Sequence, residues 1–287
     1  MIALPAKTRV KAERFTAYDM SRWSGKAGVG CMVALLMGCA GMGSENPSFD
    51  VSVSEAREAL REMEAEPGEL ERPVVVLAGL FDPGVASWNL ARQLRNLTGD
   101  ERIVSVAFPV AWNFDACRER AIAAVQDAFP SEDARWTTEV DVVGISMGGL
   151  VARYAAKERE DQDEPERRLR IARLFTISTP HQGAALAAAP SPDPRQRAMR
   201  KDSDFLKELN DRYTDTGYEL YPYVRLGDRM VGAENAAPPG EVPWWVPARF
   251  LQPDHLTASL DPRIVADIAR RLRGESPFTS EPREPLP

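Results

Sequence analysis

The fold of this chain is decided by the stretch Val140-Asp141-Val142-Val143-Gly144-Ile145-Ser146-Met147-Gly148-Gly149-Leu150. Its β-branched first half is typical of a buried strand, and the residues after it favour a helix. The turn between them fits G-x-S-x-G, in which a strained backbone pushes the serine hydroxyl out above a sheet. Glycines two positions before and after Ser146 avoid a Cβ clash where strand and helix nearly touch. We interpret Ser146 as a nucleophile; the alternative is an incidental serine in a glycine turn.

Apolar runs with strand character alternate with segments of helical spacing along the chain. Strands are expected at 73–79, 102–108, 140–145, 171–177 and 221–227. Helices are expected at 54–66, 87–97, 115–129, 149–160, 203–212 and 262–273. Such alternation predicts βαβ units and an α/β fold with a mostly parallel sheet flanked by helices. Ligands of such sheets bind beyond the carboxyl ends of the strands, where Leu80, Ser146 and Thr179 fall.

The chain divides by composition into four segments. We expect a leader and signal segment at 1–39, a tether and N-terminal helix at 40–72, the main domain at 73–273 and a flexible, proline-rich tail at 274–287. Within the main domain, 183–220 is an insertion of the right size for a lid, or alternatively a plain surface excursion.

Two shorter stretches have their own expectations. Arg159 to Arg168 is dense in charge and is expected to be a solvated surface connection. Pro238 to Pro247 is expected to be irregular; its Trp244 and Trp245 either pack against the core or line an acyl- or membrane-facing mouth.

Composition limits the classes of function. The 287 residues carry 44% hydrophobic and 28% charged residues, which indicates a globular body with a sizeable core. The formal net charge of −7 argues against nucleic acid as a partner. Three cysteines are too few for a disulfide framework and form no metal-type cluster, so we expect no metal and no cofactor. Only two histidines are available for histidine-dependent chemistry.

The N-terminal region has the pattern of an export signal. Ala27 to Ser44 is uncharged, has an apolar centre and follows Arg22 and Lys26. Leu36-Met37-Gly38-Cys39 resembles the bacterial lipobox, in which the cysteine becomes the lipidated first residue. We expect an exported, membrane-anchored lipoprotein of the cell envelope, with Cys39 as the lipidation site and Met20 as the more natural start. The alternatives are a plain signal, an uncleaved anchor and a soluble cytoplasmic protein.

A serine nucleophile needs a base and a third group that orients the base. In this architecture the partners follow in the order Ser, Asp or Glu, His, and His255 is the only histidine late enough to leave room for an acid. Asp228 follows directly after a strand and is the expected acid; the rivals are Asp215, Glu234 and Asp254. His181 is expected to border the site rather than act as the base.

The oxyanion donors are expected to be backbone amides, because these need no reorganisation during the reaction. One is the residue after the nucleophile, Met147. The other comes from the loop after Gly79, with Leu80 the expected donor.

Several of these motifs together resemble α/β-hydrolase fold serine hydrolases of the lipase and esterase branch. The matching pieces are Val76 to Leu80, Gly144 to Tyr154, Ser178-Thr179-Pro180-His181-Gln182-Gly183, Asp202 to Asn210, the Gly227-Asp228 strand end and His255. The resemblance implies a Ser146–His255–Asp228 triad with Leu80 and Met147 as oxyanion amides. Many lipases have His-Gly in the first loop, where this chain has Ala78-Gly79; that histidine usually shapes the loop rather than reacting.

The sequence therefore predicts a carboxylic ester hydrolase that acts on an ester or lipid through an acyl-enzyme. The alternatives are an acyltransferase with the same triad and a non-catalytic envelope lipoprotein on this fold. Acyl chain length, leaving alcohol and oligomeric state are open at this stage.

The proposed lipid anchor can be tested directly. Replacing Cys39 with alanine removes the thiol that would carry the lipid, so we expect the variant to leave the membrane fraction. Fractionation of cells expressing the two forms measures this, and an unchanged membrane partition would contradict the assignment.

Overall fold

The computed structural model describes residues 48–158, 166–211, 217–249, 252–281 and 283–287. The chain forms two units, Met1–Ser44 and Glu45–Pro287, and all described residues belong to the second. The predictions for the leader, Cys39 and the residues up to 47 lie outside the described residues, as does most of the charge-dense connection, 159–165. Among the residues described, no helix has both the length and the apolar character needed to span a bilayer.

A six-stranded sheet in the order β2-β1-β3-β4-β5-β6 forms the centre of the second unit, and every neighbouring pair is parallel. The strands are β1 (Val74–Leu77), β2 (Ile103–Val106), β3 (Val140–Ile145), β4 (Ile171–Ile177), β5 (Glu219–Arg225) and β6 (Trp244–Val246). The expected α/β class with a mostly parallel sheet is thereby confirmed. Because the strands are parallel, their carboxyl ends share one edge of the sheet.

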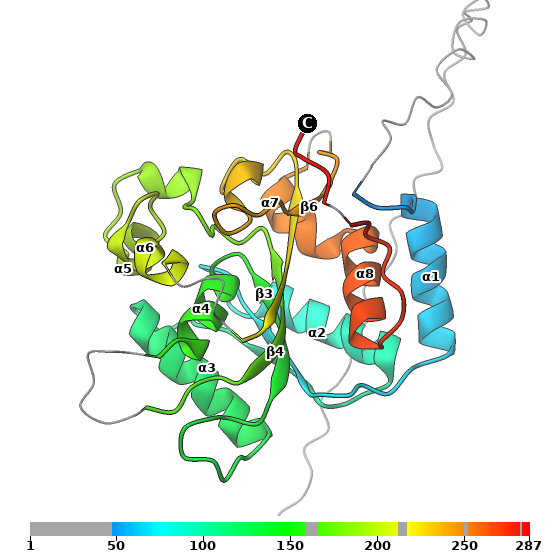
Figure 1. Ribbon diagram of the computed structural model, residues 1–287, viewed down its shortest axis with the longest axis horizontal. Coiled ribbons are helices and arrows are strands. Elements are labelled where there is room, and N and C mark those ends of the chain that lie inside the picture. The colour runs from blue at the N-terminus through cyan, green and yellow to red at the C-terminus, as the bar shows by residue number, and fades with distance from the viewer. Residues whose placement is uncertain (1–47, 159–165, 212–216, 250–251, 282) are drawn as a thin grey trace, which may run out of the picture. The chain divides into compact units, whose positions relative to one another are not determined.

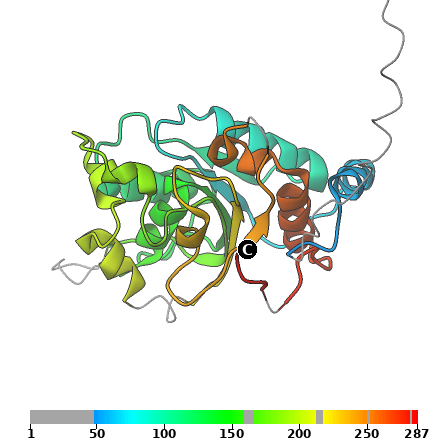
Figure 2. The ribbon, with the colours of Figure 1, turned by 90° about the horizontal axis from the view of Figure 1, so that it is seen from above.

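Helices cover both faces of the sheet (Figures 1 and 2). They are α1 (Val53–Ala65), α2 (Val85–Thr98), α3 (Phe114–Ala128), α4 (Met147–Ala156), α5 (Pro194–Ala198), α6 (Asp204–Asn210), α7 (Asp254–Thr257) and α8 (Pro262–Leu272), with 3-10 turns η1 (Ala185–Ala188), η3 (Ala233–Asn235) and η4 (Ala258–Leu260). Helices α3 and α4 lie on one face, whereas α2 and α8 lie on the other with α1 outside them.

In helices α1 and α3 the capping residue lies two positions before the first residue of the expected range. Helix α1 is capped by Ser52, not Ser54, in a reciprocal capping box with Glu55. Helix α3 is capped by Asn113, whose side chain accepts from the Ala116 amide, rather than by Asp115. In both cases a second residue with a capping side chain lies nearby, so the sequence alone does not choose between them.

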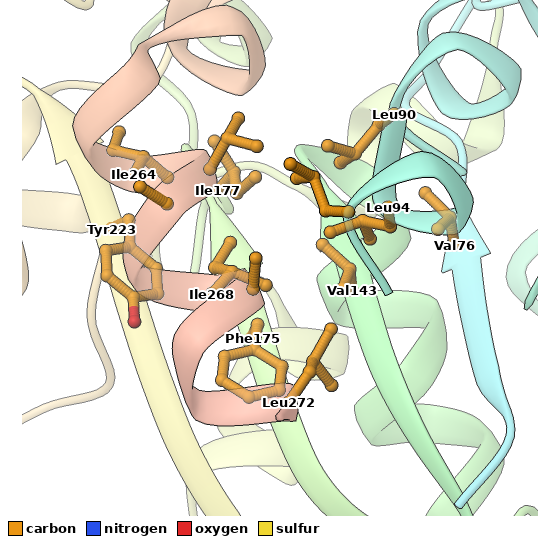
Figure 3. Packing of buried hydrophobic residues seen from close by; sticks show 14 of the residues in the cluster. Val76, Leu90, Leu94, Val143, Phe175, Ile177, Tyr223, Ile264, Ile268 and Leu272 are labelled. Carbon is orange, nitrogen blue, oxygen red and sulfur yellow. The ribbon is translucent and has the colours of Figure 1, made fainter. Parts of the chain in front are cut away.

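Both faces of strands β1 and β3 are buried, and apart from Asp141 of β3 their side chains are apolar. In β1, Val74 and Val76 belong to one core cluster and Val75 and Leu77 to the other. Figure 3 shows the first cluster, where Val143 of β3 and Phe175 of β4 pack against apolar side chains of α2 and α8. Burial of this kind contributes about 1.5–3 kcal/mol per large apolar side chain. The two clusters hold β3 rigidly between layers of helices.

The segment expected to be irregular contains a sixth strand, β6. Trp244 is 1% exposed and stacks on Tyr221 and Tyr223 of β5, and Trp245 is also buried. Of the two expectations for these tryptophans, packing against the core is the observed one. The strand has only three residues and lies between two prolines, so it is too short for an alternating pattern to be recognised in the sequence.

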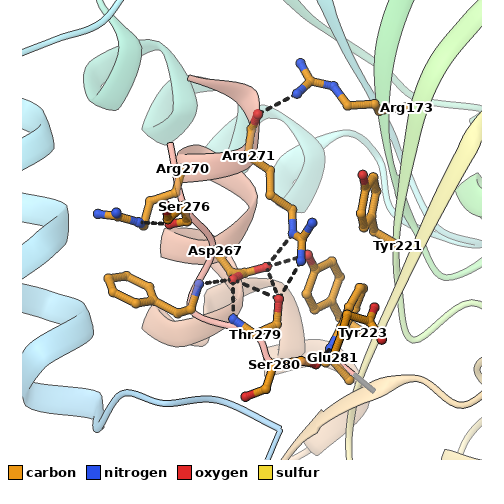
Figure 4. Close-up of polar contacts among 12 residues, drawn as sticks. Arg173, Tyr221, Tyr223, Asp267, Arg270, Arg271, Ser276, Thr279, Ser280 and Glu281 are labelled. Atoms are coloured by element: carbon orange, nitrogen blue, oxygen red, sulfur yellow. Dashed lines mark hydrogen bonds and ion pairs between the residues drawn. The ribbon is translucent and has the colours of Figure 1, made fainter. Parts of the chain in front are cut away.

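Part of the expected flexible tail is packed against the body through Asp267 of α8 (Figure 4). This buried carboxylate accepts hydrogen bonds from the backbone amides of Phe278 and Thr279, at 2.6 and 2.9 Å, and from the Tyr223 hydroxyl at 2.7 Å. Arg271 donates to the same carboxylate at 3.0 Å. Residues 278 and 279 of the tail are therefore fixed by hydrogen bonds to Asp267. The proline-rich composition of the tail does not reveal this contact.

Loss of the Asp267 carboxylate should weaken the fold. In Asp267→Ala the Tyr223 hydroxyl and two tail amides lose their shared acceptor, so we expect the free energy of unfolding to fall by about 3 kcal/mol or more. Urea unfolding followed by circular dichroism measures the change. Asp127→Ala, at an exposed position of α3, is the control and should change stability little; equal effects would contradict the role of Asp267.

Candidate active site

Ser146 lies in the turn between β3 and α4 with a strained backbone, at φ 51° and ψ −121°. The turn is possible because the residues two positions before and two positions after Ser146 are glycines. A Cβ on Gly144 would lie 2.4 Å from the Cα of Gly149, and one on Gly148 would lie 2.3 Å from the carbonyl oxygen of Leu77. Glycine is thus required by the close approach of α4 to β3 and β1.

The structure brings Ser146, His255 and Asp228 together at the carboxyl edge of the sheet. Asp228 follows β5, and His255 lies in the short helix α7. His255 Nε2 is 3.0 Å from Ser146 Oγ, and His255 Nδ1 is 2.8 Å from Asp228 Oδ2. With its Nδ1–H donating to the carboxylate, the neutral imidazole leaves Nε2 as the acceptor for the serine hydroxyl.

Asp228 is held as a carboxylate. Its side chain is fully buried, and its Oδ1 accepts from the backbone amides of Met230 and Val231 at 3.0 Å each. Burial by itself would raise the pKa of Asp228, but the hydrogen bond and charge of His255, together with the Val231 amide, lower that pKa below its usual value. The group therefore stays ionised well into the acidic range.

The rival acids do not take this position. Asp254 Oδ1 instead lies 3.4 Å from Arg225 Nε and accepts from the Arg249 amide at 3.2 Å. Glu234 lies in η3, and Asp215 lies outside the described residues.

Buried Arg225 joins the two helices that follow β6. Besides Asp254 at the start of α7, it contacts Asp261, the cap of α8, at 2.8 Å. Gly227 gives Asp254 room, since a Cβ there would lie 1.8 Å from Asp254 Oδ2. These contacts place the helix that carries His255; the sequence does not reveal them because the ion pairs join segments that are distant in the chain.

The two expected oxyanion residues flank the serine. Met147 is the first residue of α4, where a backbone amide has no acceptor within the helix. Leu80 follows β1, next to Gly79, whose Cβ position would lie 3.3 Å from Ser146 Cβ. The structure thus puts both segments beside Ser146.

Asp82 shapes the Leu80 loop and was not singled out from the sequence. Its carboxylate accepts from the amides of Gly84, Ala86 and Ser87 at 2.9, 3.3 and 3.2 Å. An Asp before Pro-Gly and a helical run is a recognisable turn and capping signal. Asp82 therefore fixes the path from β1 into α2.

An apolar pocket opens beside Ser146 and His255. Its walls come from the Leu80 loop, the Met230 loop, α7 and the first half of the expected lid-like insertion. The lining residues are Gly79, Leu80, Phe81, Asp82, Ala86, Ile145, Ser146, Pro180, Ala184, Leu186, Ala187, Gln196, Met199, Met230, Val231, His255, Leu256 and Ser259. The insertion thus forms part of the pocket wall. Within the described ranges, no group of three His, Cys, Asp or Glu side chains is arranged to hold a metal ion.

His181 is fully buried and does not line the pocket. Arg153 of α4 lies 3.0 Å from its Nδ1, and Thr176 Oγ1 lies 3.0 Å from its Nε2. Arg153 also donates to the Leu209 carbonyl at 2.6 Å, which ties α6 of the insertion to α4. Burial, and then the positive charge of Arg153, hold the pKa of His181 well below its ordinary value.

The strand order, the turn between β3 and α4, and the chain order Ser–Asp–His are those of the α/β-hydrolase fold. Residues 116–192 match the model of a family described as PGAP1-like alpha/beta domain. No curated protein matches the sequence.

Solved structures provide distant likenesses. The phospholipase PlaB from Legionella pneumophila, in complex with thio-NAD, is 14% identical with a TM-score of 0.45, over 57% of this chain and 44% of that one. The chain thus spans less than half of that protein. The mature lipase BlEst2 from Bacillus licheniformis is 15% identical, with a TM-score of 0.46 and coverage of 72% and 94%. An esterase domain from a Rhodothermus marinus protein is 20% identical, with a TM-score of 0.41 and coverage of 72% and 92%.

Buried His181 should make stability depend on pH. Its pKa is lowered in the folded state, so below about pH 6.5 the unfolded chain takes up a proton that the folded chain does not. The free energy of unfolding should then fall as pH falls from 7 to 5, by at most about 1.4 kcal/mol per pH unit from this group. Urea unfolding at several pH values should show a smaller slope for His181→Gln, and an identical slope would contradict the assignment.

Proposed function

We propose that this chain is a serine carboxylic ester hydrolase of the lipase or esterase type, acting through Ser146, His255 and Asp228. The observation that carries the proposal is the position of the His255 ring, 3.0 Å from Ser146 Oγ and 2.8 Å from Asp228 Oδ2. A serine hydroxyl is a weak nucleophile near neutral pH and needs both partners. These distances are those of hydrogen bonds able to transfer and hold a proton.

The proposed reaction has two halves. Ser146 Oγ attacks the ester carbonyl carbon while His255 Nε2 takes the hydroxyl proton, and Asp228 stabilises the imidazolium. The ester C–O bond then breaks, the proton passes to the leaving alcohol, and the acyl group stays on Ser146. In the second half, water attacks the acyl-enzyme with His255 again as base, releasing the acid and restoring the serine.

The oxyanion of each tetrahedral intermediate would be bound by the backbone amides of Met147 and Leu80. Both segments adjoin Ser146, and Met147 starts α4, where the helix dipole favours negative charge. Asp82 supports this arrangement by holding the loop that carries Leu80. Such donors need little reorganisation during the reaction.

The pocket supports an ester with an apolar acyl group. Most of its lining is aliphatic, with Ile145, Ala187 and Met199 among the side chains that an acyl chain would contact. Burial of acyl methylenes there contributes about 0.8 kcal/mol for each CH₂.

We further propose that the protein is exported and lipidated at Cys39. The lipobox-like sequence from Leu36 to Cys39 supports this proposal.

Removal of the nucleophile tests the proposal. Ser146→Ala should lower turnover of a p-nitrophenyl ester by about 10⁶-fold, because no other group can form the acyl-enzyme. Ser54→Ala, at an exposed serine of α1, is the matched control and should retain full activity. Circular dichroism checks that both variants are folded, and substantial activity in folded Ser146→Ala would refute the proposal.

The role of Asp228 as the acid can be tested separately. Asp228→Asn keeps the shape but presents an amide to His255, which disfavours the required tautomer; other triads lose about 10⁴-fold in kcat for this change. Stopped-flow kinetics with the same ester measures kcat and KM separately. A fall in kcat of less than tenfold would assign the orienting role to another residue.

A further inference from the structure

The large apolar side chains that are exposed gather at one edge of the sheet. Among the described residues they are Phe81, Val85, Trp88, Val110, Trp112, Leu186, Leu256 and Leu260. Each lies in a segment that follows the carboxyl end of a strand, namely β1, β2, β4 or β6. Val110 is 86% exposed and Trp112 is 65% exposed, although exposing such groups to water is unfavourable. We refer to these eight residues as the apolar rim.

The segments that carry the apolar rim contact one another in a ring. A Cβ on Gly84 would lie 3.4 Å from Ala107, so the loops after β1 and β2 touch. Arg195 of the insertion donates to the Phe108 carbonyl at 3.1 Å, which joins the insertion to the loop after β2. The Leu186 amide donates to the Met230 carbonyl at 3.0 Å, next to the Asp228–His255 pair. Helix α2 in turn contacts η4, which closes the ring.

The apolar rim adjoins the pocket that contains Ser146. Phe81, Leu186 and Leu256 belong to the apolar rim and also line the pocket that contains Ser146. Whatever covers the rim therefore faces the entrance to the serine. A second copy of the chain or a protein bound flat against the rim would close that entrance.

We propose that the apolar rim docks the protein on a lipid surface, so that the substrate passes from that surface directly into the pocket. This inference rests on the proposed ester hydrolysis and names the physical form of its substrate. A lipid surface both shields the rim from water and supplies acyl esters at the mouth. Two of the eight rim residues are tryptophans, which favour the boundary between headgroups and acyl chains.

Apolar contact, not charge, drives this docking. The chain has a formal net charge of −7, so anionic lipids do not attract it. Docking should therefore occur on zwitterionic phosphatidylcholine and should persist at high salt. The tryptophans that the sequence pointed to, Trp244 and Trp245, are buried and take no part.

The test replaces Val110 and Trp112 together by serine in the full chain. Neither residue lines the pocket. We expect hydrolysis of phosphatidylcholine vesicles or an emulsified triglyceride to fall at least about tenfold, while turnover of a dissolved short-chain p-nitrophenyl ester stays within about twofold. Trp136→Ser is the matched control, because Trp136 precedes β3 at the opposite edge of the sheet; it should leave both activities unchanged.

A binding measurement separates this proposal from the proposed function. Ser146→Ala should adsorb to brominated phosphatidylcholine vesicles with quenching of tryptophan fluorescence, and adding Trp112→Phe should reduce that quenching. Docking without any ester hydrolysis by the wild type would refute the proposed function alone. Equal vesicle hydrolysis and quenching in wild type and rim variants would overturn the docking proposal. A wild-type dimer in size-exclusion chromatography that Val110→Ser/Trp112→Ser makes monomeric would also overturn it, in favour of a self-interface.

Discussion

The close approach of α4 to β3 and β1 is the constraint on which the rest of the site depends. The missing side chains of Gly144 and Gly148 permit it, and the result is a serine at φ 51°. Such a backbone conformation is unfavourable for serine, so packing on both sides has to maintain it. The two core clusters do so, because β3 is buried on both faces between layers of helices. The strain at Ser146 is therefore supported by the whole sheet.

The partners of Ser146 come from the segments that follow β5 and β6, and buried polar groups position them. Asp228 is held by two backbone amides, and the helix that carries His255 is joined to β5 through Arg225 and Asp254. Removing one partner of such a buried ion pair would leave an unpaired buried charge, which is strongly unfavourable. The intact arrangement is therefore strongly preferred. The base thus reaches the serine with a defined orientation, although α7 itself is only four residues long.

The insertion between β4 and β5 contributes the pocket wall and one part of the apolar rim. Arg153 of α4, the helix that follows Ser146, contacts His181 and donates to the Leu209 carbonyl, so buried hydrogen bonds join the insertion to that helix. The same edge of the sheet therefore carries the polar groups for chemistry, the apolar pocket and the apolar surface around it. This combination follows from parallel strands, whose carboxyl ends all open on that edge.

The sequence by itself determined the strand–turn–helix around Ser146, the parallel sheet and the order of Ser146, Asp228 and His255, because these depend on local periodicity, glycine sterics and chain order. It favoured Asp228 as the acid over Asp215, Glu234 and Asp254, and only the tertiary structure showed which carboxylate reaches the histidine ring. The three-residue strand β6, the Asp267 contacts of the tail and the ring of exposed apolar residues also required the structure. Each depends on contacts between segments far apart in the chain. A local sequence pattern does not specify which distant residues these segments will contact in the folded protein.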